Sequence, residues 1–343
     1  MIVRVTDPAF WKMYDILAQK QAWLSPIHGK VPLEYYRQLA LDKRKKAEDR
    51  SYIVLREGTP LAAFIGATVE HEGTDLLAYE VPCISIEDRE RLGSSAAKDF
   101  LREFDAIAKH VGGNIHYRDF LPTGEISILS RHLLSLGALS NTFFHRVIDL
   151  RSDEAALKRN IRKSYGSLIN WGIRELTPQV VTHEDFRWEQ MDAFRKLHIR
   201  EAGRETRSEN SWRRQYEWIK GGAAFIVLGH WQGELVSAGM FEYNRSNCVY
   251  GVSASRRDLF DKPLFHSLMW VALLHAKRLG CTWFEVGHQV FPKFPANCPP
   301  SAKEMGISEF KAGFGGRTRL MLDLSLGGED LRTAQQGLAL HSQ

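Results

Sequence analysis

Two stretches of the chain, 52–67 and 225–241, decide the fold because they carry the same pattern. The first reads Tyr52-Ile53-Val54-Leu55, a charged turn with a glycine, and then Leu61-Ala62-Ala63-Phe64-Ile65-Gly66-Ala67. The second reads Phe225-Ile226-Val227-Leu228, a turn around Gly233, and then Leu235-Val236-Ser237-Ala238-Gly239-Met240-Phe241. The two copies are offset by 173 to 174 residues. Short apolar runs that flank a turn predict a β-hairpin in each half of the chain.

The same order of elements follows each hairpin: a third strand, a helix and a fourth strand. The predicted ranges are 76–81, 88–110 and 114–117 in the first half, and 248–253, 263–279 and 282–286 in the second. Because the order repeats, we expect two similar α/β domains that arose by duplication. A chance likeness between two hairpins is the alternative.

The repeat predicts an N-terminal domain over 1–150, a C-terminal domain over 151–326 and a tail over 327–343. The final strand region, from about 310 to 324, closes the second domain or returns to pack with the first. Further helices are predicted from apolar periodicity and capping residues. Their ranges are 8–18, 152–171, 184–202 and 209–220.

Composition is that of a globular protein. The 343 residues are 44% hydrophobic and 25% charged, and 18 Phe, 9 Trp and 10 Tyr supply apolar area to bury, which excludes a disordered or collagen-like chain. No apolar run approaches the roughly 20 residues of a membrane span. The first 15 residues carry charges throughout instead of the apolar stretch of a signal peptide, so we expect none there. The expected compartment is the cytoplasm.

Most familiar site signatures are missing. The sequence has no zinc-protease motif, nucleophile elbow, Walker lysine loop or dinucleotide-binding glycine fingerprint. Its 13 histidines do not cluster with other ligand residues, so no metal site is expected. The four cysteines lie far apart, and we expect buried free thiols. They are Cys83, Cys248, Cys281 and Cys298.

The second half contains three motifs that carry a family resemblance. They read Val249-Tyr250-Gly251-Val252-Ser253, Trp283-Phe284-Glu285-Val286-Gly287 and Phe310-Lys311-Ala312-Gly313-Phe314-Gly315. With the meander and the long helix, they resemble the GNAT superfamily of N-acyltransferases. The closing Phe-Lys-x-x-Phe-Gly resembles Fem-type (FemAB-like) peptidyltransferases, and no sustained heptads predict the long coiled-coil arm of the best-known members.

The resemblance implies an α/β (α+β) fold with tandem GNAT-like domains, each a mixed, mostly antiparallel sheet flanked by helices. Fem-type enzymes join amino acids from aminoacyl-tRNA to cell-wall precursors. The likeness covers most of residues 150–325 at the level of motifs, and residues 50–120 only through the internal repeat.

Two residues are the candidates for catalysis. By the family match, Lys311 supplies a cation near the acyl ester, where negative charge builds on the acyl oxygen in the transition state. Glu285, at the end of its strand, is the candidate to accept the amine proton or to bind the amine. A solvated lysine on the last strand and a structural carboxylate are the alternatives.

Seven residues are candidates for substrate binding. Arg207 occupies the place of a substrate-contacting arginine in Fem-like enzymes, and its planar guanidinium suits phosphate or carboxylate. The alternative is a solvated loop between two helices. Tyr250 and Ser253 lie on the strand where GNAT-like domains bind the acyl donor, although strand tyrosines often pack in the core. The remaining candidates are Arg204, Phe310, His288 and Gln289.

The donor decides between the main hypotheses. Acetyl-CoA enzymes of this superfamily hold pyrophosphate in a glycine-rich loop, whereas the corresponding segment 256–263 has no glycine. Residues 1–150 hold 19 Lys and Arg against 20 Asp and Glu, and residues 151–343 hold 27 against 21. This modest surplus of positive charge is compatible with a basic track for RNA. It is equally compatible with ordinary solvated helix faces. The track would comprise Arg162, Lys163, Arg256, Arg257, Arg317 and Arg319.

The leading hypothesis is an N-acyltransferase that transfers an acyl group, aminoacyl from aminoacyl-tRNA, to an amine of a cell-envelope precursor such as a nucleotide- or lipid-linked sugar or peptide. The second is an acyl-CoA-dependent N-acyltransferase that acts on an amino sugar in polysaccharide synthesis. The third is a non-catalytic GNAT-like module that binds a nucleotide sugar or RNA. No tightly bound cofactor is expected, because the acyl donor is a co-substrate.

Overall fold

The computed structural model describes the 343-residue chain in two compact units. One unit holds Met1–Phe143 with the described residues from Leu320 on, and the other holds Phe144–Arg319. The described part omits residues 44–45, 72–73, 78–80, 82, 112–114, 121–123, 295–298 and 328–343, and gives only the backbone at 71 and 74–77. Cys298 and residues 328–343 of the expected tail therefore lie outside the described residues. The expected division at residue 150 falls a few residues earlier in the structure.

The first unit contains the first predicted hairpin. β3 (Tyr52–Arg56) and β4 (Thr59–Ile65) pair antiparallel, with Tyr52 opposite Phe64, and β1 (Ile2–Arg4) and β7 (Ile84–Glu87) extend the sheet in the order β1-β3-β4-β7. A second ladder comprises β2 (Ala47–Asp49), β5 (Ala67–His71), β6 (Thr74–Leu77), β8 (Ile115–Phe120) and the end of β15 (Arg317–Leu326). Met321–Leu326 of β15 run antiparallel to β8.

Helices cover both faces of the hairpin sheet in this unit. α1 (Phe10–Ala18) and α2 (Lys30–Asp42) pack over one apolar face, which contains Ile53 and Ala63. α3 (Ser94–His110) and α4 (Ile128–Ser135) pack over the other face, which contains Val54 and Phe64. The alternating strand residues therefore serve two cores, because successive side chains of a strand point to opposite faces.

The third strand predicted over 76–81 in the first copy is present in its described first residues, within β6, but it is not the neighbour of the hairpin. β6 pairs with β5, and β7 is the strand antiparallel to β4. β6 and β7 are both short runs with apolar residues, and their local pattern does not predict which of them pairs with β4.

The second unit is built on one sheet with the order β10-β11-β12-β13-β14-β9. The second predicted hairpin is confirmed as β11 (Ala224–Trp231) and β12 (Glu234–Tyr243), with Phe225 opposite Phe241. β13 (Asn247–Ser255) pairs antiparallel with β12 and parallel with β14 (Trp283–His288). The flanking strands are β10 (Gln179–Val181) and β9 (Leu139–Asp149), whose residues 145–149 pair with β14.

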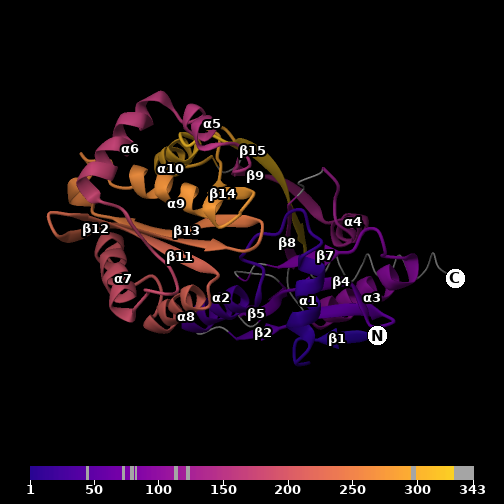
Figure 1. Ribbon diagram of the computed structural model, residues 1–343. Helices are drawn as coiled ribbons and strands as arrows, with labels where there is room; N and C mark the ends of the chain where they lie inside the picture. The colour runs from indigo at the N-terminus through magenta and orange to yellow at the C-terminus, as the bar shows by residue number, and fades with distance from the viewer. Residues whose placement is uncertain are drawn as a thin grey trace. The chain divides into compact units, whose positions relative to one another are not determined.

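Helices also lie on both faces of this sheet (Figure 1). α6 (Lys163–Leu176) and α9 (His266–Arg278) cover one face and pack on each other, and α7 (Trp188–Ala202) and α8 (Glu209–Lys220) cover the other. α8 occupies the predicted range, and the Ser208 hydroxyl accepts a hydrogen bond from the Ser211 NH at its start. The unit is thus a mixed, mostly antiparallel sheet between helices, as the resemblance implied.

One helix prediction and one strand prediction in this unit were wrong. The single helix expected over 152–171 is two helices, α5 (Glu154–Arg159) and the start of α6. The strand expected from residue 310 is the end of α10 (Ala302–Ala312), and β15 begins only at Arg317. A reciprocal capping box between Ser301 and Glu304 starts α10 directly after the proline-rich stretch.

The described residues show no metal centre and no membrane helix. No group of three His, Cys, Asp or Glu within them is arranged to hold a metal ion. Among the same residues, no helix has both the length and the apolar content to cross a bilayer. Cys83, Cys248 and Cys281 are buried free thiols.

Candidate active site

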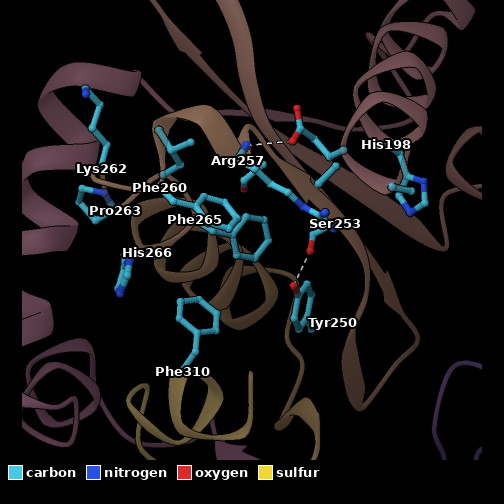
Figure 2. Close-up of a pocket in the computed structure, with 15 residues that line it drawn as sticks. His198, Tyr250, Ser253, Arg257, Phe260, Lys262, Pro263, Phe265, His266 and Phe310 are labelled. Atoms are coloured by element: carbon cyan, nitrogen blue, oxygen red, sulfur yellow. Dashed lines mark hydrogen bonds between the residues drawn. The ribbon is translucent and has the colours of Figure 1, made fainter. Parts of the chain in front are cut away.

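A cavity of about 490 Å³ lies in the second unit at the end of β13. Its wall is formed by β13, the short helix η1 (Arg257–Leu259), the loop that leads into α9, and α10. Figure 2 shows Tyr250, Ser253 and Phe310 facing this cavity, with a hydrogen bond between the first two. A second cavity of about 490 Å³ shares these three residues and adds Lys311 and Lys303. We call the two together the active-site cavities.

The cavities lie where two parallel strands stop pairing. The register joins Asn247–Val249 of β13 to Trp283–Glu285 of β14. Tyr250 is the next residue of β13, and in the described register it pairs only with Phe241 of β12. The edge of β13 that follows Val249 is therefore open to a ligand, and parallel strands that separate in this way are a common position for ligand sites.

Lys311 reaches the gap from the last turn of α10. Its Nζ lies 5.8 Å from the centre of the Tyr250 ring. A β-carbon on Gly287 would lie 2.7 Å from the same Nζ, and Gly287 has a φ of +112° at a β-bulge in β14. Burial lowers the pKa of the Lys311 ammonium, and it forms no ion pair with a carboxylate in the described part of the chain. An unneutralised, half-buried cation beside a cavity is suited to meet negative charge on a ligand.

α10 is held in place by Gln289, which follows β14. Its amide donates to the Ser308 hydroxyl, which in turn accepts a hydrogen bond of 3.0 Å from the Val290 NH. Gln289 is buried and does not line the active-site cavities. Its position therefore supports the helix that presents Lys311. His288 is exposed and lies opposite His145 in the β14–β9 ladder.

Glu285 lies on β14, within the sheet. Its side chain is buried, and Oε1 accepts a 2.9 Å hydrogen bond from the Asn247 amide. The Oε2 atom is 4.0 Å from Nε2 of His145. Glu285 is not among the residues that line either active-site cavity. As arranged here, this carboxylate is a buried hydrogen-bonding group of the sheet.

A second buried carboxylate, Glu242 of β12, was not a candidate from the sequence. A β-carbon on Gly251 of the neighbouring strand would lie 2.1 Å from its Oε1, so the glycine makes room for the acid. Burial, with a smaller contribution from Glu285, raises the pKa of Glu242 to about 8, and Arg207 opposes the shift. The sequence does indicate this residue, since Glu242 is the only charged residue in the mostly apolar stretch 235–243.

Arg207 lies between α7 and α8, in the place that the resemblance indicates. Its guanidinium carbon is 5.1 Å from the centre of the Trp212 ring, and its charge acts on both Glu242 and His198. Burial first, and then Arg207, lowers the pKa of His198 to about 4, so that this histidine is neutral at pH 7. Figure 2 shows His198 at the edge of the cavity, on α7. Arg204 of the same loop is exposed and lines neither active-site cavity.

The structure therefore brings together Tyr250, Ser253, Phe310 and Lys311 at one pair of cavities. Arg207 is linked to this group electrostatically through His198. The other four candidates are placed outside the cavities. They are Glu285, Arg204, His288 and Gln289.

The basic residues considered for an RNA track do not all line one cavity. Arg256 is bound by Asp258 and Glu234, so its charge is already neutralised. Arg257 lines the first active-site cavity. Arg162, Arg317 and Arg319 line a different cavity of the same unit.

No protein-family model and no curated protein sequence matches this chain. Solved structures do match. The chain superposes on a structure of FemX with a TM-score of 0.70 at 11% identity, covering 94% of this chain and 96% of that one. It matches L-PGS from Bacillus licheniformis with a TM-score of 0.57 at 13% identity, covering 93% and 91%. It also matches a tandem GNAT protein from the clavulanic acid biosynthesis pathway, with a TM-score of 0.53 at 13% identity and coverage of 96% and 98%. This chain therefore has the tandem GNAT-like fold and resembles the Fem proteins, as its motifs implied.

Proposed function

We propose that this protein is an N-acyltransferase that moves an aminoacyl group from aminoacyl-tRNA to an amine of a cell-envelope precursor, a nucleotide- or lipid-linked sugar or peptide. The observation that carries the proposal is Lys311, a half-buried cation without a carboxylate partner among the described residues. It faces Tyr250 at the point where β13 and β14 separate. The fold shared with FemX and L-PGS supports aminoacyl transfer as the reaction class.

In this reaction the amine nitrogen of the acceptor forms a bond to the acyl carbon, and the bond from that carbon to the ribose oxygen of the tRNA breaks. The amine loses a proton, and the ribose oxygen gains one. Negative charge builds on the acyl oxygen before the ester bond breaks, and a fixed cation at that point lowers the barrier. Lys311 has this role in the proposal, and its burial strengthens the interaction because less water screens it.

The contacts of the loop before α9 support an RNA ester over a CoA thioester as the donor. A CoA pyrophosphate is usually bound by free backbone NH groups at the start of such a helix. Here most NH groups of the segment 256–266, which leads into α9, donate within the protein. The donors are the NH groups of Arg256, Arg257, Leu259, Phe260, Lys262, Leu264 and His266.

A second candidate is an acyl-CoA-dependent N-acyltransferase that acts on an amino sugar. The observation in its favour is the first active-site cavity, which lies beside the loop that leads into α9 and is lined by Arg257 and Lys262. The structure of the matched tandem GNAT protein is described as the form without AcCoA, which names AcCoA as a molecule of interest for that protein. Lys262, however, pairs with Asp261 at 2.7 Å, which reduces its attraction for a phosphate.

The catalytic part of the proposal is tested with Lys311→Ala. We expect the single-turnover rate of acyl transfer from aminoacyl-tRNA to fall by about 10²–10³, the usual cost of removing a group that stabilises the transition-state oxyanion. The unfolding midpoint should change little, because Lys311 is at a helix end. Lys158→Ala removes an exposed lysine from α5 and serves as the matched control. Unaltered turnover in Lys311→Ala would refute the assignment.

The donor is tested by thermal shift with aminoacyl-tRNA, acetyl-CoA, longer acyl-CoAs and nucleotide-linked amino sugars. A ligand that binds only the native state raises the unfolding midpoint according to its affinity. We expect stabilisation by aminoacyl-tRNA. Stabilisation by CoA compounds, together with indifference to RNA, would refute the tRNA donor and favour the second candidate.

A further inference from the structure

A cavity of about 720 Å³ in the second unit is lined by arginines and is not part of the active site. Its wall is formed by the end of β9, the segment from α5 to α6, and the turn between α10 and β15. We call it the arginine cavity. Its arginines are Arg146, Arg151, Arg162, Arg317 and Arg319. Phe314 lines this cavity, and its ring lies 5.2 Å from that of Phe310, which lines the active-site cavities. The aromatic pair therefore stands between the two sites.

The positive charge of the arginine cavity is mostly uncompensated. Asp149 is the one carboxylate among the residues that line it, and Arg151 already binds both of its oxygens. None of the other four arginines forms an ion pair with a carboxylate in the described part of the chain. Isolated surface arginines are usually spread over the surface, but these four line one concave surface.

The bonds that two of these arginines do form are to neutral oxygens. Arg146 donates from Nε to the Gly315 carbonyl at 2.7 Å and from a terminal nitrogen to the Thr318 hydroxyl at 3.2 Å. Arg162 donates to the Glu309 carbonyl at 3.3 Å. These contacts hold the guanidinium groups in position and leave their charge unneutralised. Burial lowers the pKa of Arg146, so part of this charge is also desolvated.

The turn before the last two arginines, which lie on β15, is fixed by close packing. Gly315 and Gly316 have φ of +87° and +77°, and a β-carbon on Gly316 would lie 2.4 Å from the Val147 carbonyl oxygen. Only glycine allows the turn to approach β9 so closely. Arg319 and Arg151 both lie against the Trp283 ring, at 5.9 and 4.9 Å from its centre. The site is thus preorganised before any ligand binds.

We propose that the arginine cavity binds a ligand that carries two or more phosphate groups. Several guanidinium groups recognise phosphate oxygens with directed hydrogen bonds, and a cavity of this size holds more than one such group. The start of α6 at Lys163 adds the partial positive charge of a helix N-terminus beside Arg162. The phosphodiester chain of an RNA and a free polyphosphate share this chemistry. If the ligand is RNA, the site would hold the backbone of the proposed donor away from its acyl end.

Equilibrium binding tests the proposal on the full chain. The probes are a fluorescein-labelled 12-nucleotide single-stranded RNA, followed by anisotropy, and tripolyphosphate, followed by calorimetry and by competition with the RNA. The test variant is Arg317→Gln/Arg319→Gln, and the control is Arg245→Gln/Arg278→Gln. The control removes two exposed arginines of the same unit that do not line the arginine cavity.

We expect the test variant to bind its ligand about tenfold or more weakly at low salt, and the control variant to match the wild type. For RNA, the slope of log affinity against log salt should fall by about 1.4, because each lost phosphate contact on a single strand contributes about 0.7. Binding that is weakened in the test variant and not in the control supports the site, whether it concerns RNA alone, tripolyphosphate alone or both. The pattern identifies the source of the phosphates.

Failure to bind either probe, or equal weakening in the test and control variants, would overturn the proposal. Equal weakening would show that net charge, and not this cavity, determines the affinity. The assay measures binding without turnover, so its outcome is separate from the Lys311→Ala test. Loss of transfer in Lys311→Ala, with unchanged affinity for both RNA and tripolyphosphate in Arg317→Gln/Arg319→Gln, would reject the arginine cavity and leave the proposed function standing.

Discussion

Replacing Glu242 by glutamine should remove a pH dependence of stability that the buried carboxyl group imposes on the second unit. In the folded protein burial raises the pKa of Glu242 from 4.5 to about 8. In the unfolded chain the group ionises near its ordinary pKa. Between these two values the unfolded state releases a proton that the folded state retains, so the free energy of unfolding falls as the pH rises. Below pH 4.5 the carboxyl group is protonated in both states.

The magnitude follows from the two pKa values. Stability changes by about 1.4 kcal/mol per pH unit while only one state is ionised, and levels off above the folded pKa. Between pH 6 and pH 9 the Glu242 contribution should therefore fall by about 3 kcal/mol. Glutamine has nearly the same shape and does not ionise, so it should still fit against Gly251.

The assay is urea unfolding at pH 6, 7, 8 and 9, followed by tryptophan fluorescence, because Trp212 and Trp218 are buried in the same unit. The quantity of interest is the difference between wild type and Glu242→Gln at each pH, which cancels other titrating groups. Glu234→Gln, an exposed residue at the start of β12, is the control. Parallel stability curves for wild type and Glu242→Gln over this range would refute the buried, protonated carboxyl group.

Two substitutions test the packing around Lys311. Gly313→Ala should lower the free energy of unfolding by about 1–3 kcal/mol, because its β-carbon would lie 2.2 Å from the Tyr165 ring; urea titration measures this. Gly287→Ala should slow acyl transfer by about tenfold or more, because its β-carbon would displace the Lys311 ammonium. Gly280→Ala places alanine at a similar positive φ with no neighbouring atom within 4 Å, so it should reduce stability without a comparable effect on rate.

Gly306→Ala is the control for Gly313→Ala, since Gly306 lies in the middle of α10 with open space around it. Alanine there should stabilise the helix by about 0.5–1 kcal/mol. If both alanine variants changed stability in the same direction, the contact between Gly313 and Tyr165 would not be the cause. If Gly280→Ala and Gly287→Ala slowed transfer equally, backbone strain would explain the loss.

The local sequence patterns were sufficient for the hairpins, because strand alternation and turn residues act over a few positions. Tyr52 opposite Phe64 and Phe225 opposite Phe241 confirm both hairpins. The choice of β7 over β6 as the partner of β4 depends on contacts between segments distant in sequence. Apolar content is similar in both candidates, and so it did not decide the pairing.

The segment around Lys311 could have been predicted better. Phe310 and Phe314 are four residues apart, which is helical spacing, and Ser301 with Glu304 is a capping box. We expected a strand from about residue 310 instead. Residue type alone, however, could not show that Lys311 is half-buried against Gly287 or that it has no carboxylate partner among the described residues.

By itself, the sequence determined the internal repeat, the two hairpins, helix α8 and the motif that indicates the GNAT-like fold. These features depend on period, capping and turn chemistry, which are local properties. Only the tertiary structure decided which charged groups are buried, paired or left unpaired. Glu242 is buried in the sheet, and Arg256 is neutralised by an ion pair. Four arginines of one cavity have no carboxylate partner among the described residues. The physical reason is that desolvation and ion pairing depend on neighbours in space, and those neighbours come from segments far apart in the chain.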